Sequence, residues 1–294
     1  MDIFLQLIAS GITVGGIYAL IALGFVLIYK ATSIINFATG EFMMVGAYFC
    51  LTLLIHPQFP FLLCFFLTLG FAVLLGILAE RLVLRPLIGE PIISVIMVTI
   101  GLSSILKGLV QVIWGPEEKG FPSVFPQTLL KIGPVVISPN YLWGFLIAIL
   151  CVVIFAAFFK YSRSGVAMRA TACDQQVALS MGISVKKILA LSWSLGAMAA
   201  AIGGMVIGSI AGINLQLGLI GLKIIPVVIL GGLDSIGGAI LGGFIMGILE
   251  NLAGGYLGSV FGGAIKEVAP FVVLVLILMV RPYGLFGKVK IERV

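Results

Sequence analysis

The chain contains nine apolar runs, most of them close to the length that a helix needs to cross a bilayer. They fall near residues 3–29, 33–55, 60–79, 91–113, 140–159, 187–212, 218–233, 236–253 and 264–280. A hydrocarbon core about 30 Å thick takes about 20 apolar residues per helix. Backbone groups in lipid find no water, so only helices or a closed barrel can span it. Barrel strands alternate in hydrophobicity, whereas these runs are apolar on every face. We therefore predict an all-α, polytopic integral membrane bundle of about eight or nine transmembrane helices.

The composition points to the same class. Hydrophobic residues make up 61% of the 294 residues and charged residues 10%. A soluble domain carries about 25% charged residues, so this chain has too few to cover a water-facing surface. No segment between the runs is long enough for a soluble domain, and we expect residues 1–294 to form a single transmembrane domain. The first run has no basic flank and no clear cleavage site, so we expect it to be retained as a span.

The basic residues indicate which side of the membrane each connection occupies. Most of the 17 lysines and arginines lie in the connection 160–187, in the C-terminal tail and in the short loop around residues 81–85. Such residues collect in cytoplasmic loops. The connection 115–140 carries balanced charge and several prolines, so we place it outside. The C-terminus is then cytoplasmic, and nine full spans put the N-terminus outside; one re-entrant run would move it inside.

The basic connection Tyr161–Lys187 is predicted to hold one or two short helices. Asp174 suits an N-cap, and Gly182 suits the left-handed position that ends a helix. Ala178 and Gly182 leave a face of small residues beside Arg169. This face would fit into a groove on a cytosolic partner. A basic loop that only contacts anionic lipid headgroups fits the same residues.

Polar residues within the apolar runs are candidates for the transport site, because a charge there costs about 2.5–3.5 kcal/mol. Three of them, Asn36, Thr39 and Glu41, cluster around Gly40 at the start of the second run. A broken helix would offer backbone N–H groups to a carboxylate, and Glu41 would pair with an ammonium group. Alternatively, Glu41 caps a helix near the cytoplasmic face and forms a salt bridge with Lys30.

Other polar residues leave further alternatives open. Lys107 and Gln111 share one helix face, where they either line a vestibule or reach toward the headgroups. Asp234 lies in a glycine-rich break, which is either a meeting point of two half-helices that face the pathway or a tight turn. Lys223 marks an outer gate or a polar turn, and Glu250 is expected at the membrane interface.

Enzyme chemistry finds no support in the residues. His56 is the only histidine, so no nucleophile has a histidine partner beyond that one position. The four cysteines show no paired spacing, which predicts neither a metal site nor a disulfide framework. The phosphate-binding pattern GxxxxGK[ST] does not occur, so ATP-driven transport would need a separate ATPase polypeptide. We expect no nucleic-acid binding.

Six segments, in order along nearly the whole chain, resemble the branched-chain amino acid ABC transporter permease family. They read GGIYALIALGFVLIY (15–29), NFATGE (36–41), GAY (46–48), ERLVLRPL (80–87), GGLDSIGGAILGG (231–243) and RPYGLFG (281–287). Thr39 departs from the pattern, since members of this family often carry histidine there. That difference bears on substrate choice or on a polar contact.

The basic connection itself is similar to the coupling loop of ABC importers, with the pattern E-A-A-x-x-x-G. Gln176, Val177 and Ala178 occupy the E-A-A positions and Gly182 the glycine. The first two letters differ from the pattern. This resemblance implies that the loop helix transmits ATPase closure to the membrane bundle.

The family resemblance implies a permease subunit of the bacterial inner membrane that takes up amino acids or related solutes such as amides or urea. It implies a second permease that is a related chain or a copy, two cytosolic ATPases that hold ATP and magnesium, and a periplasmic or extracellular solute-binding protein. No cofactor is expected in this chain. A self-sufficient ion-coupled carrier or channel is the alternative, with Glu41 or Asp234 binding the coupling ion.

Overall fold

The chain forms a helical bundle in which every apolar run becomes a helix. The computed structural model describes residues 2–55, 59–122, 130–132 and 135–287. The apolar helices are α1 (Asp2–Thr32), α2 (Thr39–Ile55), α3 (Phe61–Ala79), α4 (Ile92–Trp114), α5 (Pro139–Tyr161), α8 (Val185–Ala211), α9 (Leu217–Gly231), α10 (Ile236–Phe261) and α11 (Ile265–Val280). The basic connection forms α6 (Arg163–Cys173) and α7 (Gln175–Ser180). His56 and the basic residues beyond Gly287 lie outside the described residues.

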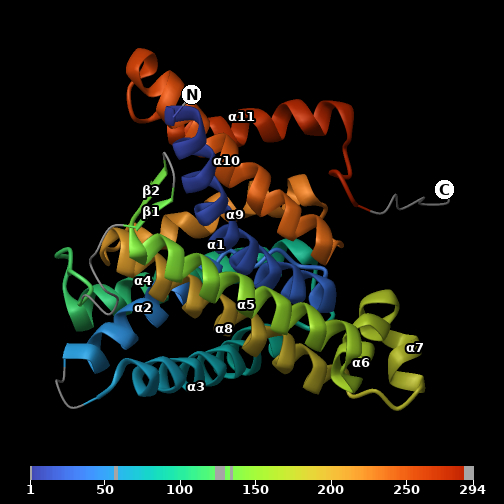
Figure 1. Cartoon of the computed structure of the whole chain (residues 1–294). Coiled ribbons are helices and arrows are strands. Elements are labelled where there is room, and N and C mark those ends of the chain that lie inside the picture. The colour runs from blue at the N-terminus through green and yellow to red at the C-terminus, as the bar shows by residue number, and fades with distance from the viewer. Residues whose placement is uncertain (1, 56–58, 123–129, 133–134, 288–294) are drawn as a thin grey trace.

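Helix α1 is the centre of the bundle and packs against α5, α8 and α10 (Figure 1). Glycines make these contacts close. A Cβ at Gly15 would lie 2.8 Å from the Cα of Phe244 in α10, and one at Gly24 would lie 2.7 Å from the Cβ of Ala199 in α8. Small residues allow this approach because dispersion and packing, rather than hydrophobic burial, hold helices together in lipid. The high glycine content of the chain therefore serves helix packing around α1.

The two ends of the bundle carry different structures. Helices α6 and α7 lie at one end, below and to the right in Figure 1, and we call this the α6–α7 end. The opposite end carries an antiparallel pair, β1 (Leu130–Ile132) and β2 (Val135–Ile137), in which Lys131 is opposite Val136. We call this the hairpin end. There the backbones of Lys119 and Ile213 exchange hydrogen bonds of 2.8 and 2.9 Å, which tie the long connection to the α8–α9 loop.

Six of the apolar helices are long enough to cross a bilayer by length and composition: α1, α3, α4, α5, α8 and α10. Helices α2, α9 and α11 are shorter, with 17, 15 and 16 residues. Each of these falls below the roughly 20 residues of a full span. In α2 the missing length is supplied by residues 33–38, which are not helical and enter the bundle as an irregular segment.

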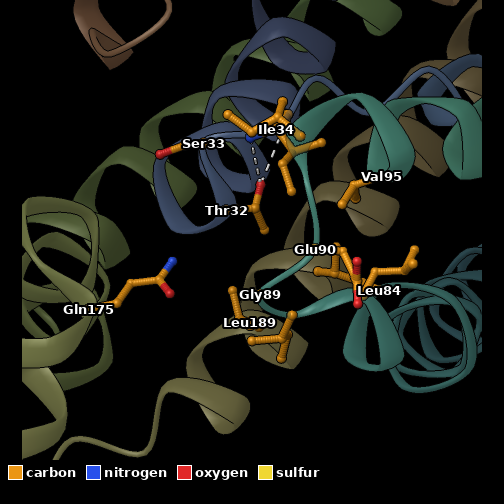
Figure 2. A pocket seen from close by; sticks show the side chains of 12 residues that line it. Thr32, Ser33, Ile34, Leu84, Gly89, Glu90, Val95, Gln175 and Leu189 are labelled. Atoms are coloured by element: carbon orange, nitrogen blue, oxygen red, sulfur yellow. Dashed lines mark hydrogen bonds between the residues drawn. The ribbon is translucent and has the colours of Figure 1, made fainter.

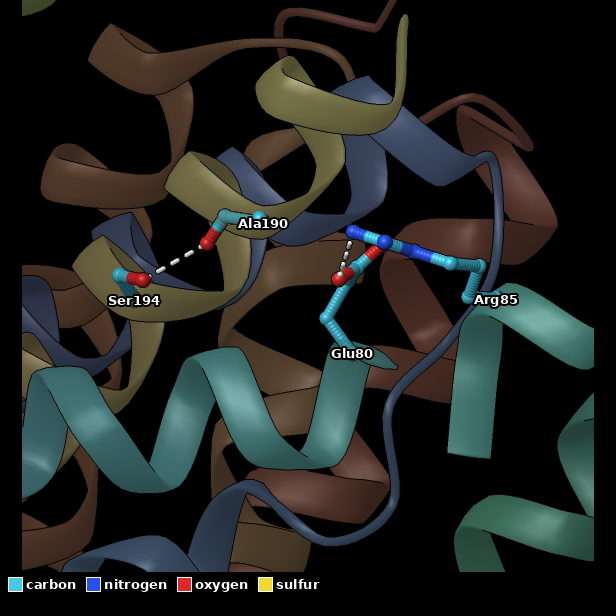
Figure 3. A network of polar contacts seen from close by, with 4 residues as sticks. All are labelled: Glu80, Arg85, Ala190 and Ser194. Carbon is cyan, nitrogen blue, oxygen red and sulfur yellow. Dashed lines mark hydrogen bonds and ion pairs between the residues drawn. The ribbon is translucent and has the colours of Figure 1, made fainter. Parts of the chain in front are cut away.

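The α3–α4 corner at the α6–α7 end is fixed by a buried ion pair. Helix α3 continues into a π-helical turn over Glu80–Leu84 that packs against α8. Glu80 is fully buried, and Arg85 donates to both of its carboxylate oxygens at 3.2 and 2.9 Å (Figure 3). A two-pronged arginine contact fixes direction as well as distance. The corner is therefore a rigid joint between α3, α4 and α8.

Candidate functional site

The irregular segment before α2 is the most polar part of the bundle interior. Asn36 accepts a hydrogen bond from the backbone of Ala38 at 3.0 Å, and Thr39 donates from its hydroxyl to the Asn36 carbonyl at 2.9 Å. These contacts form a turn of the kind that asparagine favours, and α2 begins directly after it. Asn36, Thr39 and Glu41 are all buried. The second apolar run is therefore helical only from Thr39 on, and the start of α2 lies inside the protein.

Glycines bring the beginning of α2 against the beginning of α9. A Cβ at Gly40 would lie 2.0 Å from the carbonyl oxygen of Gly218, and one at Gly221 would lie 2.3 Å from the Cα of Gly40. No residue with a side chain fits at either place without a shift of the backbone. Two short helices thus meet through their N-terminal turns, where free N–H groups and the helix dipole favour negative charge.

Glu41 projects from this junction toward α4. Its side chain lies beside Gly218, whose Cβ would sit 3.1 Å from Oε1. Ser103 and Lys107, both on α4, act electrostatically on this carboxylate. Glu41 is only 8% exposed, and its Oε2 has no hydrogen-bond partner; the same holds for Nδ2 of Asn36. Two polar atoms therefore end in the bundle interior with unused bonding capacity.

Lys30 and Lys107 bear on two of the alternatives that the sequence leaves open. The Lys30 ammonium lies 5.0 Å from the ring centroid of Phe159, whereas the Glu41 carboxylate faces α4. Glu41 lies in the first turn of α2 and is buried in the bundle. Lys107 is exposed on α4, on the side where that helix meets α2.

Asp234 lies away from this group, in the short turn between α9 and α10. The turn is a tight one: Gly232 has φ +102°, and Ser235 caps α10 by accepting from the Gly238 N–H at 3.0 Å. A cavity of about 170 Å³ lies beside it, lined in part by Tyr29 and Tyr283. Helices α9 and α10 are therefore joined here by a tight turn at the end of the bundle.

The segment after α11 completes that turn. Leu285 and Phe286 donate backbone hydrogen bonds of 2.8 and 3.1 Å to the carbonyls of Leu230 and Gly231. These are among the last carbonyls of α9, which lack partners within the helix. Gly284, at φ +75°, lets the chain pass close to the α9 backbone. We call residues 281–287 the α9 clasp.

Helices α6 and α7 form the predicted surface at their end of the bundle. Asp174 caps α7 by accepting from the backbones of Gln176 and Val177 at 2.8 and 3.0 Å, and Gly182 ends the turn with φ +81°. Both sequence predictions about the ends of this helix are confirmed. Ala178 is buried against the bundle, whereas Gly182 is exposed, so the two small residues do not form one docking face as the sequence suggested.

The outward face of α7 is apolar. Val177 is 57% exposed, Leu179 56% and Met181 78%. Gln176 is also exposed. Arg169 points away from this surface: its guanidinium donates to the carbonyls of Phe159 and Lys160 at the end of α5. The α7 face consists of Gln176, Val177, Leu179 and Met181, and Arg169 holds α6 on the bundle behind it.

A cavity of about 220 Å³ opens at the same end, between the end of α1, the α3–α4 corner and the start of α7 (Figure 2). Its polar lining consists of Thr32, Ser33, Glu90 and Gln175. Gln175 also donates to the Ala31 carbonyl at 3.4 Å, which joins α7 to the end of α1. The cavity therefore adjoins both the α7 face and the chain segment that leads to Asn36.

Two features of the interior were not predicted. Thr99 and Ser103 face the 36–41 segment from α4. Thr99, Ser103 and Lys107 follow one another at intervals of four residues, and this periodicity is the signal that would have found them. Glu250 was expected at the membrane interface, and this was wrong. It is buried, accepting from the Tyr18 hydroxyl at 2.7 Å and from Lys223 at 3.4 Å. Lys223 accordingly belongs to an interior ion pair.

Comparison with known proteins covers almost the whole chain. A sequence model of the family described as "Branched-chain amino acid transport system / permease component" matches residues 7–280. The high-affinity branched-chain amino acid transport system permease protein BraD of Pseudomonas aeruginosa is 33% identical over 99% of this chain and 98% of its own length. LivH of Escherichia coli K12, with the same description, is 32% identical over 99% and 98%. A probable LivH of the archaeon Methanocaldococcus jannaschii is 29% identical over 96% and 92%.

Among solved structures, PsaBC from Streptococcus pneumoniae in complex with Fab matches 95% of this chain and 92% of its own, with a TM-score of 0.52 and 14% identity. This likeness concerns the fold, and it agrees with the all-helical bundle. The sequence relatives decide between the two functional alternatives. They favour a transport-system subunit over a self-sufficient carrier or channel, and they place the chain in the inner membrane as a multi-pass protein. The chain belongs to the branched-chain amino acid transport permease family, so it is a membrane permease subunit of an ABC importer and not an enzyme.

Proposed function

We propose that residues 1–294 form one permease domain that carries branched-chain or similar small amino acids when a separate ATPase docks on the α7 face. The observation that supports this most is the exposure of Val177, Leu179 and Met181 on a capped helix beyond the apolar spans. Three large apolar side chains in water indicate a protein contact. Their position in the coupling-loop pattern indicates an ATPase as the partner.

The α7 face is built to transmit force. Asp174 and Gly182 fix both ends of α7, and the buried Ala178 seats it on the bundle. Arg169 acts as a positioning residue, because it bonds the carbonyls that end α5. Helix C-terminal carbonyls favour a cation. Movement of the ATPase would therefore pass through Gln176–Gly182 into α5 and, through Gln175, into α1.

The orientation follows from the same surface. Arg81, Arg85, Lys160, Arg163, Lys186 and Lys187 all lie at the α6–α7 end. The clasp that follows α11 lies beside Tyr29 at the end of α1, which Gln175 joins to α7. We assign this end, and with it the C-terminus, to the cytoplasm, and the hairpin end to the side of a solute-binding protein. The assembly further includes a second permease and two ATPases, which hold ATP and magnesium.

Within the bundle, we assign the solute pathway to Asn36, Thr39, Gly40 and Glu41. Thr39 and Gly40 shape the junction, while Asn36 and Glu41 supply the unpaired polar atoms. Asp234 has a different part in this scheme. It lies in the α9–α10 turn beside the clasp, and we assign it to the movement of the cytoplasmic end and not to solute contact.

The test separates docking from folding. In Gly182→Arg, the added Cβ meets no atom within 4 Å, but the residue must adopt φ +81°, which costs about 1–2 kcal/mol and disturbs the end of α7. Met181→Asp leaves the backbone unchanged and puts a charge on the α7 face. We expect both variants to insert normally, to lose co-purification with the ATPase and to lose leucine uptake in proteoliposomes.

Gly182→Asn is the control, because asparagine tolerates the left-handed region. It should retain uptake. Leucine flux through wild-type permeases without any ATPase would contradict the proposal, as would normal uptake by Met181→Asp.

A further inference from the structure

Helix α4 carries a polar stripe that its apolar surroundings do not explain. Thr99, Ser103, Lys107 and Gln111 recur at every fourth position of a 23-residue apolar helix. Residues four apart lie on the same side of a helix. We call these four residues the α4 stripe. Val95, one step before Thr99, lines the cavity at the α6–α7 end.

The stripe follows the irregular segment from the cavity into the interior. Val95 lines the cavity together with Thr32, Ser33 and Ile34. One turn farther along α4, Thr99 accepts from the Phe37 backbone at 3.4 Å. One turn beyond that, Ser103 is among the α4 groups that act electrostatically on Glu41. The two chain segments therefore run side by side from the cavity to the buried carboxylate.

Two buried polar atoms along this line lack a hydrogen-bond partner. Leaving a buried polar atom without a partner costs about 1–3 kcal/mol, and this applies to Asn36 Nδ2 and Glu41 Oε2. Lys107 and Gln111 are exposed on the isolated chain at membrane depth, where an ammonium in contact with lipid costs about 2.5–3.5 kcal/mol. Polar and charged side chains at this depth are tolerated where they face a water-filled pathway instead of lipid hydrocarbon.

We propose that the solute moves along the α4 stripe, with its ammonium group on Glu41, its carboxylate on Lys107 and Ser103, and a second permease closing the open side. This inference rests on the proposed function and adds the route and the residues that bind the two charges of the amino acid. Without a solute, the carboxylate of Glu41 on α2 and the ammonium group of Lys107 on α4 attract each other. An amino acid carries both charges, so it can form one ion pair with Glu41 and one with Lys107 in place of that attraction. An uncharged amide cannot form either ion pair.

Two adjacent serines provide a matched test of the route. Ser103 faces Glu41, whereas Ser104 is exposed about 100° around α4 and bonds to its own helix at the Ile100 carbonyl, at 3.2 Å. Each is replaced by Cys in a Cys151→Ala, Cys173→Ser background, because those are the two native thiols that are not fully buried. The complete transporter is treated with an anionic methanethiosulfonate in vesicles.

We expect the reagent to reduce leucine uptake at least fivefold in Ser103→Cys and less than twofold in Ser104→Cys. Leucine should slow the modification of Cys at position 103 alone. Equal inhibition of both variants, or inhibition of Ser104→Cys only, would overturn the route. The rate of thiol modification itself is measured on the protein, so the comparison stands even if the cargo is not leucine.

Charge variants test the zwitterion assignment separately. Glu41→Gln and Lys107→Met should each raise the KM for leucine at least tenfold, while ATPase co-purification stays at the wild-type level. Variants that assemble and keep KM within twofold would overturn the assignment of the charges. If the wild-type transporter carries no leucine, the proposed cargo is wrong. The rates of thiol modification at positions 103 and 104 are measured without assuming that cargo.

Discussion

At the scale of single residues, two buried glutamates differ in how their charge is paired. Both oxygens of Glu250 have partners, Tyr18 on α1 and Lys223 on α9, so this residue joins three helices. Glu41 keeps one oxygen free. A saturated carboxylate holds its neighbours in place, whereas an unsaturated one can receive a ligand. We therefore assign Glu250 to stability and Glu41 to transport.

The Glu250 assignment gives a stability prediction. Lys223→Met should leave an uncompensated buried charge and destabilise the protein by about 3–5 kcal/mol. Adding Glu250→Gln removes that charge while keeping an acceptor for Tyr18, so the double variant should recover at least half of the loss. Thermal unfolding in detergent measures both. A double variant as unstable as the single one would show that Lys223 acts through packing instead.

Gly40 gives a second prediction at this scale. Gly40→Ala puts a methyl group 2.0 Å from the Gly218 carbonyl oxygen, so α2 and α9 must move apart. We expect uptake to fall at least tenfold. Gly70→Ala is the matched control, since its Cβ meets nothing within 4 Å on α3 and helix propensity favours alanine. Equal uptake by the two variants would show that the tight crossing is not needed for transport.

At the scale of elements, the apolar runs predicted the helices closely. A run long enough to cross the lipid must pair its own backbone groups, and a helix is the structure that does so. The run 33–55 is the instructive exception. Its first six residues are as apolar as the rest, yet Asn36 forms a turn with Ala38 and Thr39, and the helix begins only at Thr39. Hydropathy does not register such side-chain turns. The meeting of this segment with α4 and α9 depends on tertiary packing and could not be predicted.

The α9 clasp allows a prediction for one element acting on another. Gly284 and Gly262 have similar dihedral angles, φ +75° and +80°, but a Cβ at Gly284 would lie 2.3 Å from the Ile229 carbonyl oxygen, whereas Gly262 has open space. Both Ala variants bear about 1–2 kcal/mol of backbone strain. Only Gly284→Ala should also release the clasp. We expect its thermal midpoint to fall clearly below that of Gly262→Ala; equal midpoints would contradict the clasp.

At the scale of the whole molecule, burial is uneven. Within the most apolar stretch of each helix, 89% of α1 residues are buried but only 17% of α4 residues. Helix α4 also packs mainly on α2 and the α3–α4 corner. A helix with polar residues on an open face indicates a neighbour in the assembly. The sequence predicted a second permease from family resemblance, whereas our assignment of α4 as its contact face depends on the burial pattern of the fold.

The open face of α4 gives a prediction for the assembly. A photoreactive amino acid at Ile93 or Ile100, which are exposed and lie on the same side of α4 as Lys107, should cross-link to a second permease chain in the intact transporter. The mass of the product tells a copy from a relative. The same probe at Leu74 on α3, which is also exposed, is the comparison. Cross-links to lipid alone from α4 would place the partner elsewhere.

The central position of α1 has a consequence for how the protein is made. Gly11 and Gly15 pack on the α10 residues near position 248, which leave the ribosome about 240 residues later. At 5–20 residues per second, this delay is roughly 10–50 s. During that time the first helix is in the membrane without the partners that bury it. The middle of α1 is uncharged and uniformly apolar, so this helix is stable in lipid before its partners are made. The core of the bundle therefore forms late in synthesis, around the helix that was synthesised first.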